Sequence, residues 1–313
     1  MKVFIAGATG VLGRRLVRQF CERGDEVLAL VRSPEREALV RSLGGEPRRA
    51  DLFDAESLAR VAQGAEVVIH AATAIPTTAQ AIADDWAMND RIRRDGTRAL
   101  LECSRKIGAR RFLFQSIVWV VRPKDQSEFD ETSPCVPHPL YDSATDGEKL
   151  ALEAAGGGAL DVSILRCGSF YAADAAHART FAELVKQHKL PIPGKGEAVW
   201  AIIHADDAAA AHVTAAHAPR TGLWHVVDDV PVTVGEFFAE LATRLEAPPP
   251  LHLAEWMIRM AAGATVIEFL TTSTRTSNRR LRTELGWTPR YPSFREGLDQ
   301  VVSEWRAEGF PGE

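Results

Sequence analysis

Short apolar segments alternate with amphipathic helical segments along the first half of the chain. The apolar runs lack polar alternation, and they lie at 3–6, 27–31, 67–69, 112–114 and 162–165. Runs of this kind are typical of strands that are buried on both faces. After the first run, Leu12, Leu16 and Phe20 repeat at the spacing of one helix face. The alternation predicts an α/β fold with a doubly wound parallel sheet.

The pattern changes after about residue 165. Hydrophobic periodicity there predicts mainly helices, separated by proline-containing stretches, over 181–187, 205–216, 234–245 and 253–262. We therefore expect a nucleotide-binding domain over 1–165. A smaller, mostly helical substrate-side domain is expected over 166–313, partly interleaved with the first.

Composition narrows the functional classes. Hydrophobic residues make up 46% of the chain and charged residues 25%, as in ordinary globular proteins. A net charge of -5 argues against a nucleic-acid partner, although arginines cluster between 91 and 111. The four cysteines form neither a CxxC pair nor a metal-ligand spacing, so reduced thiols are expected. With no signal-peptide pattern and no apolar stretch of membrane-spanning length, we expect a cytoplasmic protein without a membrane partner.

A glycine-rich turn links the first apolar run to the first amphipathic helix. It reads Gly7-Ala8-Thr9-Gly10-Val11-Leu12-Gly13. In this context Gly7 is suited to the tight turn, Gly10 to close approach of a pyrophosphate, and Gly13 to packing of helix on strand. The helix N-terminus then holds the anion. We expect this Rossmann-type turn to bind a dinucleotide.

The residue that follows the second apolar run indicates which dinucleotide binds. An NAD site usually has an acidic residue there, which accepts the ribose 2′-hydroxyl. This chain has Arg32 instead. A guanidinium group suits a 2′-phosphate, so we expect NADP(H) to be favoured over NAD(H).

Further motifs stand in the order found in extended and atypical short-chain dehydrogenases/reductases. They are Asp51-Leu52, His70-Ala71-Ala72, Gly96-Thr97, Arg166 with Tyr171, His204 to Asp207, and Leu285 to Pro289. Together with the glycine turn, they make the chain resemble this NAD(P)-dependent epimerase/dehydratase-like family over nearly its whole length. The resemblance implies that Asp51 and Leu52 contact the adenine, and that Ala71 and Ala72 lie beside the ribose and phosphates.

The family's catalytic tyrosine and lysine stand four residues apart on one helix. This chain departs from that pattern. Aligned without a gap, Leu140 takes the tyrosine position and Ala144 the lysine position. A shift of one residue brings in Tyr141, but its partner is then Thr145, which carries no charge. Both registers remain open.

The family's catalytic hydroxyl after the fifth strand is also missing. Ile117 takes that position, and its neighbour Ser116 is a substitute candidate. Ser116 and Tyr141 are therefore the candidate catalytic residues. Without a nearby cation, Tyr141 should keep a pKa near about 10 and act as a hydrogen-bond donor rather than a base. Such a site favours reduction, above all of an iminium, a quinonoid ring or a conjugated acceptor.

Aromatic residues indicate the substrate class. Trp200 stands where nucleotide-sugar enzymes of this family carry an arginine that binds the diphosphate, so a nucleotide-sugar substrate is not expected. An apolar or aromatic small molecule fits better. The candidate substrate-binding residues are Trp119, Tyr141, Phe170, Tyr171 and Trp200. Ordinary core packing of these aromatic residues remains an alternative.

His204, Asp206 and Asp207 are not expected to bind a metal. One histidine and two adjacent carboxylates would point their ligands in different directions at a strand–helix junction. Asp206 or Asp207 is instead expected to cap the helix that follows.

These observations predict an NADPH-dependent reductase of an apolar or aromatic metabolite, in which the cofactor supplies the hydride. A redox-inert NADP-binding sensor or partner protein is an alternative, as is a non-redox isomerase or lyase on the same fold. The family resemblance also implies a possible homodimer, formed through helices at about 86–106 and 141–155.

Overall fold

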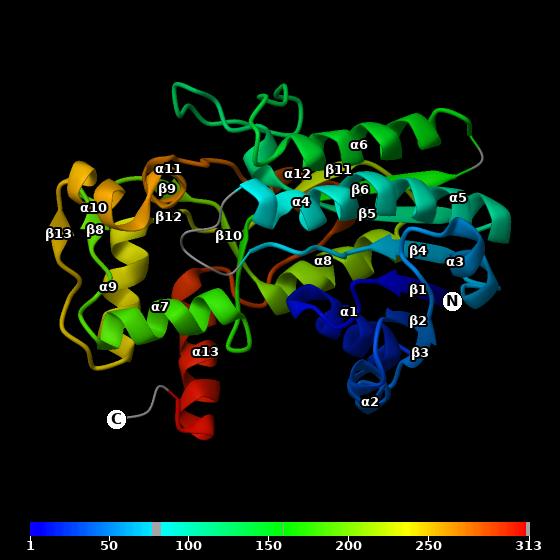
Figure 1. Cartoon of the computed structure of the whole chain (residues 1–313), viewed down its shortest axis with the longest axis horizontal. Helices are drawn as coiled ribbons and strands as arrows, with labels where there is room; N and C mark the ends of the chain where they lie inside the picture. The colour runs from blue at the N-terminus through cyan, green and yellow to red at the C-terminus, as the bar shows by residue number, and fades with distance from the viewer. Residues whose placement is uncertain (77–82, 159, 311–313) are drawn as a thin grey trace.

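A seven-stranded parallel sheet forms the centre of the computed structural model, which describes residues 1–76, 83–158 and 160–310. The strand order is β11-β6-β5-β4-β1-β2-β3 (Figure 1). Every adjacent pair runs parallel. The strands are β1 Lys2–Ala6, β2 Glu26–Val31, β3 Glu46–Arg49, β4 Val67–His70, β5 Arg111–Ile117, β6 Asp161–Cys167 and β11 Leu223–Val226. The predicted α/β fold class is confirmed.

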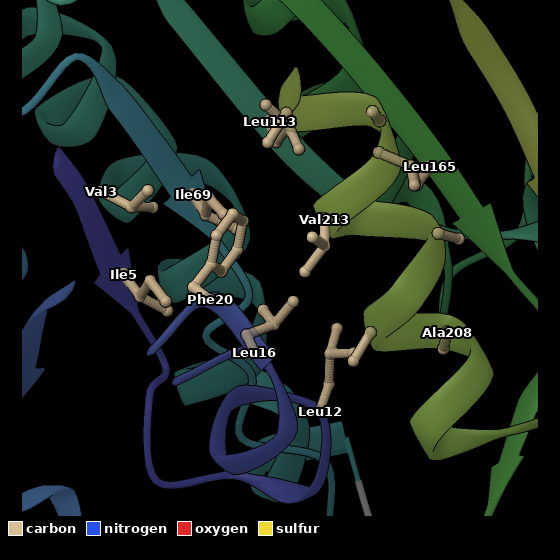
Figure 2. Close-up of a cluster of buried hydrophobic side chains, with 14 of the residues drawn as sticks. Val3, Ile5, Leu12, Leu16, Phe20, Ile69, Leu113, Leu165, Ala208 and Val213 are labelled. Atoms are coloured by element: carbon tan, nitrogen blue, oxygen red, sulfur yellow. The ribbon is translucent and has the colours of Figure 1, made fainter. Parts of the chain in front are cut away.

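Helices cover both faces of this sheet. They are α1 Val11–Glu22, α2 Pro34–Ser42, α3 Ala55–Val61, α4 Ala83–Arg91, α5 Thr97–Ile107, α6 Asp142–Ala155, α8 Ala205–His217 and α12 Arg279–Leu285. On one face, side chains of α1 and α8 pack against the strands, as Figure 2 shows for Leu12, Leu16, Phe20 and Val213. On the other face, α3, α5 and α6 enclose a second apolar core around Phe112 and Phe114.

The hydrophobic pattern did not predict one strand, because that strand is polar. One predicted helix is interrupted by a change in its backbone hydrogen bonding. β3 has the sequence Glu-Pro-Arg-Arg and lies at the edge of the sheet, so it lacks the apolar pattern of the central strands. The helix expected at about 86–106 is interrupted by a π-helical turn, η1 Ile92–Gly96. There the Thr97 hydroxyl donates to the Arg93 carbonyl oxygen at 2.6 Å, where a side chain competes with the regular helical ladder.

The second half of the chain supplies both a smaller lobe and part of the sheet layer. The elements of the lobe are β7 Ser169–Tyr171, α7 Ala176–Lys186, β8 Ile192–Pro193, β9 Val199–Trp200, β10 Ile202–His204, β12 Val232–Thr233, α9 Val234–Arg244, β13 His252–Leu253, α10 Glu255–Ala262, α11 Ala264–Thr271 and α13 Phe294–Glu308. This lobe has its own aromatic core around Phe237, Phe238 and Trp305. By contrast, α8, β11 and α12 return to the sheet, so the two parts interleave.

Candidate functional site

Two glycines of the turn after β1 are packed too closely against the backbone to carry a side chain. Gly7 has a φ of +90°, and an added Cβ would lie 2.5 Å from the backbone of Ala71, which follows β4. A Cβ on Gly13 would lie 2.0 Å from the Gly7 carbonyl oxygen. Both positions therefore require glycine, because no neighbouring backbone can move away without disrupting the sheet. The turn brings the ends of β1 and β4 together.

The N-terminus of α1 opens beside this turn. Its N-cap residue, Gly10, is extended and has no side chain to bond the free N–H groups, and the first helical turn carries no acidic residue. The sheet reverses its strand order between β1 and β4, which is where dinucleotides bind in doubly wound folds. The helix dipole and the free N–H groups favour an anion here. The turn therefore fits a pyrophosphate.

The predicted cofactor residues divide into those that face the turn and those that support it. Thr9, Gly10 and Ala72 are at least partly exposed at the turn, whereas the Leu12 side chain is buried in the core beneath it. Val11 packs against the core of the smaller lobe. Leu12 can thus contribute to a ligand only through its backbone.

His70, which belongs to the predicted His70-Ala71-Ala72 motif but was given no role of its own, holds the turn after β4 in place. Its Nδ1 accepts the Ala72 N–H at 3.3 Å, and its Nε2 lies 3.2 Å from the Ile92 carbonyl oxygen. Burial lowers the pKa of His70 to about 4. The ring is therefore neutral at pH 7 and carries its proton on Nε2, which donates to Ile92.

A cavity of about 430 Å³ opens at the ends of β2 and β3, and we call it the β2–β3 cavity. Its lining residues are Val31, Arg32, Arg49, Ala50, Asp51, Leu52, Phe53, Met88 and Ile92. Among the described residues, the exposed Arg32 side chain has no hydrogen-bond or ion-pair partner. Asp51 accepts the Phe53 N–H at 2.9 Å. The cavity thus contains the three predicted residues Arg32, Asp51 and Leu52.

Arg49 in this cavity was missed by sequence reasoning. The β2–β3 register pairs it with Val31, the residue before Arg32. Its guanidinium forms an ion pair with Glu37. The position of Arg49 was hard to predict from the sequence, because β3 lacks the apolar pattern that identified the other strands. The β2–β3 cavity therefore presents two guanidinium groups, which are suited to bind an anionic group.

Tyr141 lies at the start of α6, within a cluster of aromatic rings. Its ring stacks on His138 with centroids 4.8 Å apart, and the Trp119 ring lies 5.9 Å away. The Arg122 guanidinium carbon is 5.5 Å from the Tyr141 ring centroid. The expectation of a tyrosine without a nearby cation is therefore wrong, because the cation comes from the segment before α6 and not from the helix position four residues on.

The expected pKa of Tyr141 is also wrong. Burial raises the pKa of its hydroxyl to about 12, and the charge of Arg122 only partly opposes that effect. Tyr141 is therefore protonated across the physiological range, and it can donate a hydrogen bond but cannot act as a base. Lys149, the next lysine along α6, is 68% exposed and pairs with Asp146 at 3.9 Å.

Ser116 does not take over the role of the missing hydroxyl. It is fully buried, and its hydroxyl donates to Glu148. Glu148 in turn forms a buried ion pair with Arg166 at 2.6 Å. A hydroxyl that is hydrogen-bonded to a buried carboxylate contributes to the packing of α6 on the sheet. The prediction of Ser116 as a catalytic residue is therefore wrong.

The predicted substrate-binding aromatic residues lie in three places. Trp119 belongs to the Tyr141 cluster and stacks on Phe269 of α11, with centroids 5.1 Å apart. Phe170 packs against the core of the sheet layer. Tyr171 donates to Asp228 at 2.9 Å, and Trp200 donates to the Phe269 carbonyl oxygen at 3.1 Å. Tyr171 and Trp200 are core residues of the smaller lobe, which was the alternative left open for these aromatic residues.

The helix cap of α8 differs from the prediction. His204, not Asp206 or Asp207, is the N-cap, and its Nδ1 accepts the Asp206 N–H at 3.2 Å. Asp206 pairs with Arg15, while Asp207 accepts the N–H groups of Arg290 and Tyr291. Neither carboxylate caps α8, because Asp206 binds a partner on α1 and Asp207 binds partners on the segment before α13. No cluster of three metal-ligating side chains occurs within the described part of the chain.

Comparison with known proteins gives concordant results. A model of the NAD dependent epimerase/dehydratase family matches residues 3–226. A 3-diazoavenalumate denitrifying reductase from Streptomyces sp. is 34% identical over 309 residues, which is 95% of this chain and 99% of that protein. A 4-hydroxy-2-methyl-3-oxo-4-farnesyl-3,4-dihydroquinoline-1-oxide ketoreductase from Stigmatella aurantiaca is 27% identical over 77% of this chain and 72% of its own length.

Solved structures show the same fold. A dTDP-glucose 4,6-dehydratase from Streptomyces venezuelae, with NAD bound, superposes with a TM-score of 0.80 at 23% identity. The superposition covers 99% of this chain and 98% of that protein. Within the described ranges, no helix has the length and apolar character needed to cross a bilayer.

Proposed function

The chain belongs to the NAD-dependent epimerase/dehydratase family, and we propose that it is an NADPH-dependent reductase of an aromatic small molecule. Because it belongs to this family and its relatives are named as reductases, the protein is an oxidoreductase. The cofactor, when bound, supplies a hydride. The residues of the chain must bind it, choose between its phosphorylated and unphosphorylated forms, and hold an acceptor beside it.

The observation that carries the proposal is the state of Tyr141. Its pKa is about 12, and Lys149 is turned to solvent, so the family's tyrosine–lysine pair has no counterpart on α6. A site without a base suits the reduction of an acceptor rather than the oxidation of an alcohol. The surrounding rings of Trp119, His138 and Phe269 favour an aromatic acceptor.

An acceptor that needs no proton fits this site best. An aryl diazonium ion meets that condition, because one hydride converts it into an arene and dinitrogen with atoms and charge in balance. The Streptomyces relative is named for a denitrifying reduction of a diazo compound. We extend the same reaction class to this chain. In this proposal Tyr141 donates a hydrogen bond and the aromatic rings exclude water.

Cofactor choice is assigned to the β2–β3 cavity. Arg32 and Arg49 both line it, and Arg32 has no partner among the described residues. A 2′-phosphate would give Arg32 an anionic partner and Arg49 a second one beside Glu37, whereas the bare hydroxyl of NADH would not. We therefore propose that NADPH is the working cofactor.

The reaction class can be tested by comparing acceptors. Purified protein with NADPH would be given 4-methylbenzenediazonium or 4-methylbenzaldehyde, and loss of NADPH absorbance followed against a protein-free control. We expect a protein-dependent rate with the diazonium ion that exceeds the aldehyde rate by at least tenfold, since the aldehyde requires a proton donor of lower pKa. A faster aldehyde rate would contradict the proposed acceptor class. Tight NADPH binding without transfer to either acceptor would favour a redox-inert module.

A further inference from the structure

Two hydrogen-bond donors converge on one carboxylate oxygen beside Tyr141. Arg122 donates from Nη1 to Glu268 Oε1 at 2.5 Å, and the Nε2 of His138 lies 3.1 Å from the same oxygen. Both donors come from the segment between β5 and α6, whereas Glu268 lies on α11 of the smaller lobe. The sheet layer thus provides a carboxylate receptor, and the smaller lobe fills it.

The hydrogen bond at the other ring nitrogen of His138 supports its role as a donor. Its Nδ1 accepts the backbone N–H of Leu140 at 3.3 Å. In a neutral imidazole the proton must then lie on Nε2, the atom that faces Glu268. In that tautomer His138 donates to the same carboxylate oxygen as the Arg122 guanidinium.

The receptor borders the aromatic cluster of the proposed substrate site. The His138 ring stacks on Tyr141, and the Arg122 guanidinium lies 5.5 Å from the centroid of the same ring. Trp119 links Tyr141 to Phe269, the residue next to Glu268 on α11. Trp119 follows the carboxyl end of β5, the side of a doubly wound sheet on which ligands bind.

Arg122 and Glu268 are unequally buried. This difference indicates whether a ligand that replaces one of them should be an anion or a cation. The Arg122 side chain is 12% exposed and that of Glu268 is 38% exposed. A buried cation without an anion is strongly destabilising, whereas Glu268 can return to water at little cost. A ligand that separates the pair must therefore bring an anion to Arg122 rather than a cation to Glu268.

We infer that Arg122 and His138 bind the carboxylate of an aromatic acid, which takes the place of Glu268. A guanidinium fork matches a carboxylate in geometry and in charge, and the adjacent rings match the aromatic part of such a ligand. This inference rests on the proposed function in one respect: it specifies the aromatic acceptor as one that carries a carboxylate. Glu268 is then an internal competitor that occupies the receptor in the free protein.

The inference can be tested by binding alone. Cinnamate and its uncharged analogue cinnamamide would be titrated into the NADPH-loaded protein by calorimetry. We expect cinnamate to bind at least tenfold more tightly than cinnamamide. Arg122→Gln should abolish this difference, and Glu268→Gln should strengthen cinnamate binding several-fold, because the internal competitor has lost its charge.

A matched control is Arg295→Gln, which removes an exposed ion pair with Glu240 in the smaller lobe and should leave both affinities unchanged. Each variant's unfolding temperature and NADPH affinity would show that it folds. Equal binding of the two probes, or an unaltered preference in Arg122→Gln, would overturn the inference. So would phenyltrimethylammonium binding that exceeds cinnamate binding and is lost in Glu268→Gln. Since these titrations need no turnover, their failure is distinct from a failure to reduce the diazonium ion, which carries no carboxylate.

Discussion

Arg32 directly follows β2 and Arg49 ends the neighbouring β3, and only one of these two arginines could be predicted from the sequence. Arg32 could be predicted because it stands where an acidic residue is expected after an apolar strand. Arg49 could not, because its role depends on the β2–β3 register and its own strand is polar. Ser116 was wrongly predicted to be catalytic for a related reason: its buried partner Glu148 is 32 residues away in sequence.

We predict that both arginines contribute to the preference for NADPH. Arg32→Ala and Arg49→Ala should each reduce the ratio of NADPH to NADH affinity about tenfold, or about 1.4 kcal/mol. Arg41→Ala is the control, because Arg41 also pairs with Glu37 but does not line the β2–β3 cavity. Fluorescence titration of both cofactors would measure the ratios. Equal NADPH and NADH affinities in the unmodified protein would refute the assignment.

Tyr141 permits a second prediction at the residue scale. General acid catalysis is worth roughly 10² to 10⁴-fold where it operates. If the acceptor needs no proton, Tyr141→Phe should slow the reduction of 4-methylbenzenediazonium by no more than about threefold, well below that range. Single-turnover decay of NADPH absorbance would measure the effect. A loss of a hundredfold or more would show that the Tyr141 hydroxyl takes part in the hydride-transfer step, and would contradict this prediction.

At the scale of elements, the buried strands and the helix after β1 could be predicted because their patterns are local. The cap of α8 could not, since Asp206 is drawn to Arg15 on α1 and leaves the capping role to His204. The π-helical turn between α4 and α5 also escaped prediction. It depends on the Thr97 hydroxyl and the close packing of Gly96 against Leu52, neither of which alters the hydrophobic periodicity.

The turn between β1 and α1 offers a substitution that separates folding from binding. An added Cβ on Gly10 would lie 3.4 Å from the nearest neighbouring atom, an ordinary contact, whereas one on Gly13 would lie at 2.0 Å. Gly10→Ala should therefore keep the unfolding temperature but lose at least tenfold in NADPH affinity, because a methyl group blocks the pyrophosphate. Gly13→Ala should destabilise the fold by about 1–3 kcal/mol or more. Equal NADPH affinity of Gly10→Ala and the unmodified protein would argue against the turn as the phosphate site.

At the scale of the whole molecule, the sequence predicted two parts that divide near residue 165 and partly interleave, but not which elements cross from one part to the other. The sheet layer takes α8, β11 and α12 from the second half of the sequence, which length and composition cannot reveal. The pairing of Arg122 with Glu268, 146 residues apart in sequence, is therefore a property of the assembled fold.

We also predict a homodimer, formed through α4, α5 and α6, as is common in this family. Leu152 on α6 is 53% exposed and would lie in that interface. Leu152→Glu should convert a dimer to a monomer, because it would bury an unpaired charge at the contact. Met260→Glu on α10 is the control, at a residue that is 78% exposed but distant from these helices in the fold (Figure 1). Light scattering at micromolar concentration would decide, and a monomeric unmodified protein would remove the prediction.

The central claim is that this chain transfers a hydride from NADPH to an aromatic acceptor. The most direct test uses NADPH deuterated at C4, prepared separately in each of its two stereochemical forms, with 4-methylbenzenediazonium as acceptor. Mass spectrometry of the toluene product should find deuterium from one form only, because a bound nicotinamide presents a single face to the acceptor. At the same NADPH concentration, Gly10→Ala should lower the amount of protein-dependent labelled product, because it binds NADPH more weakly. Toluene labelled equally from both forms, or label that is independent of the protein, would contradict the account.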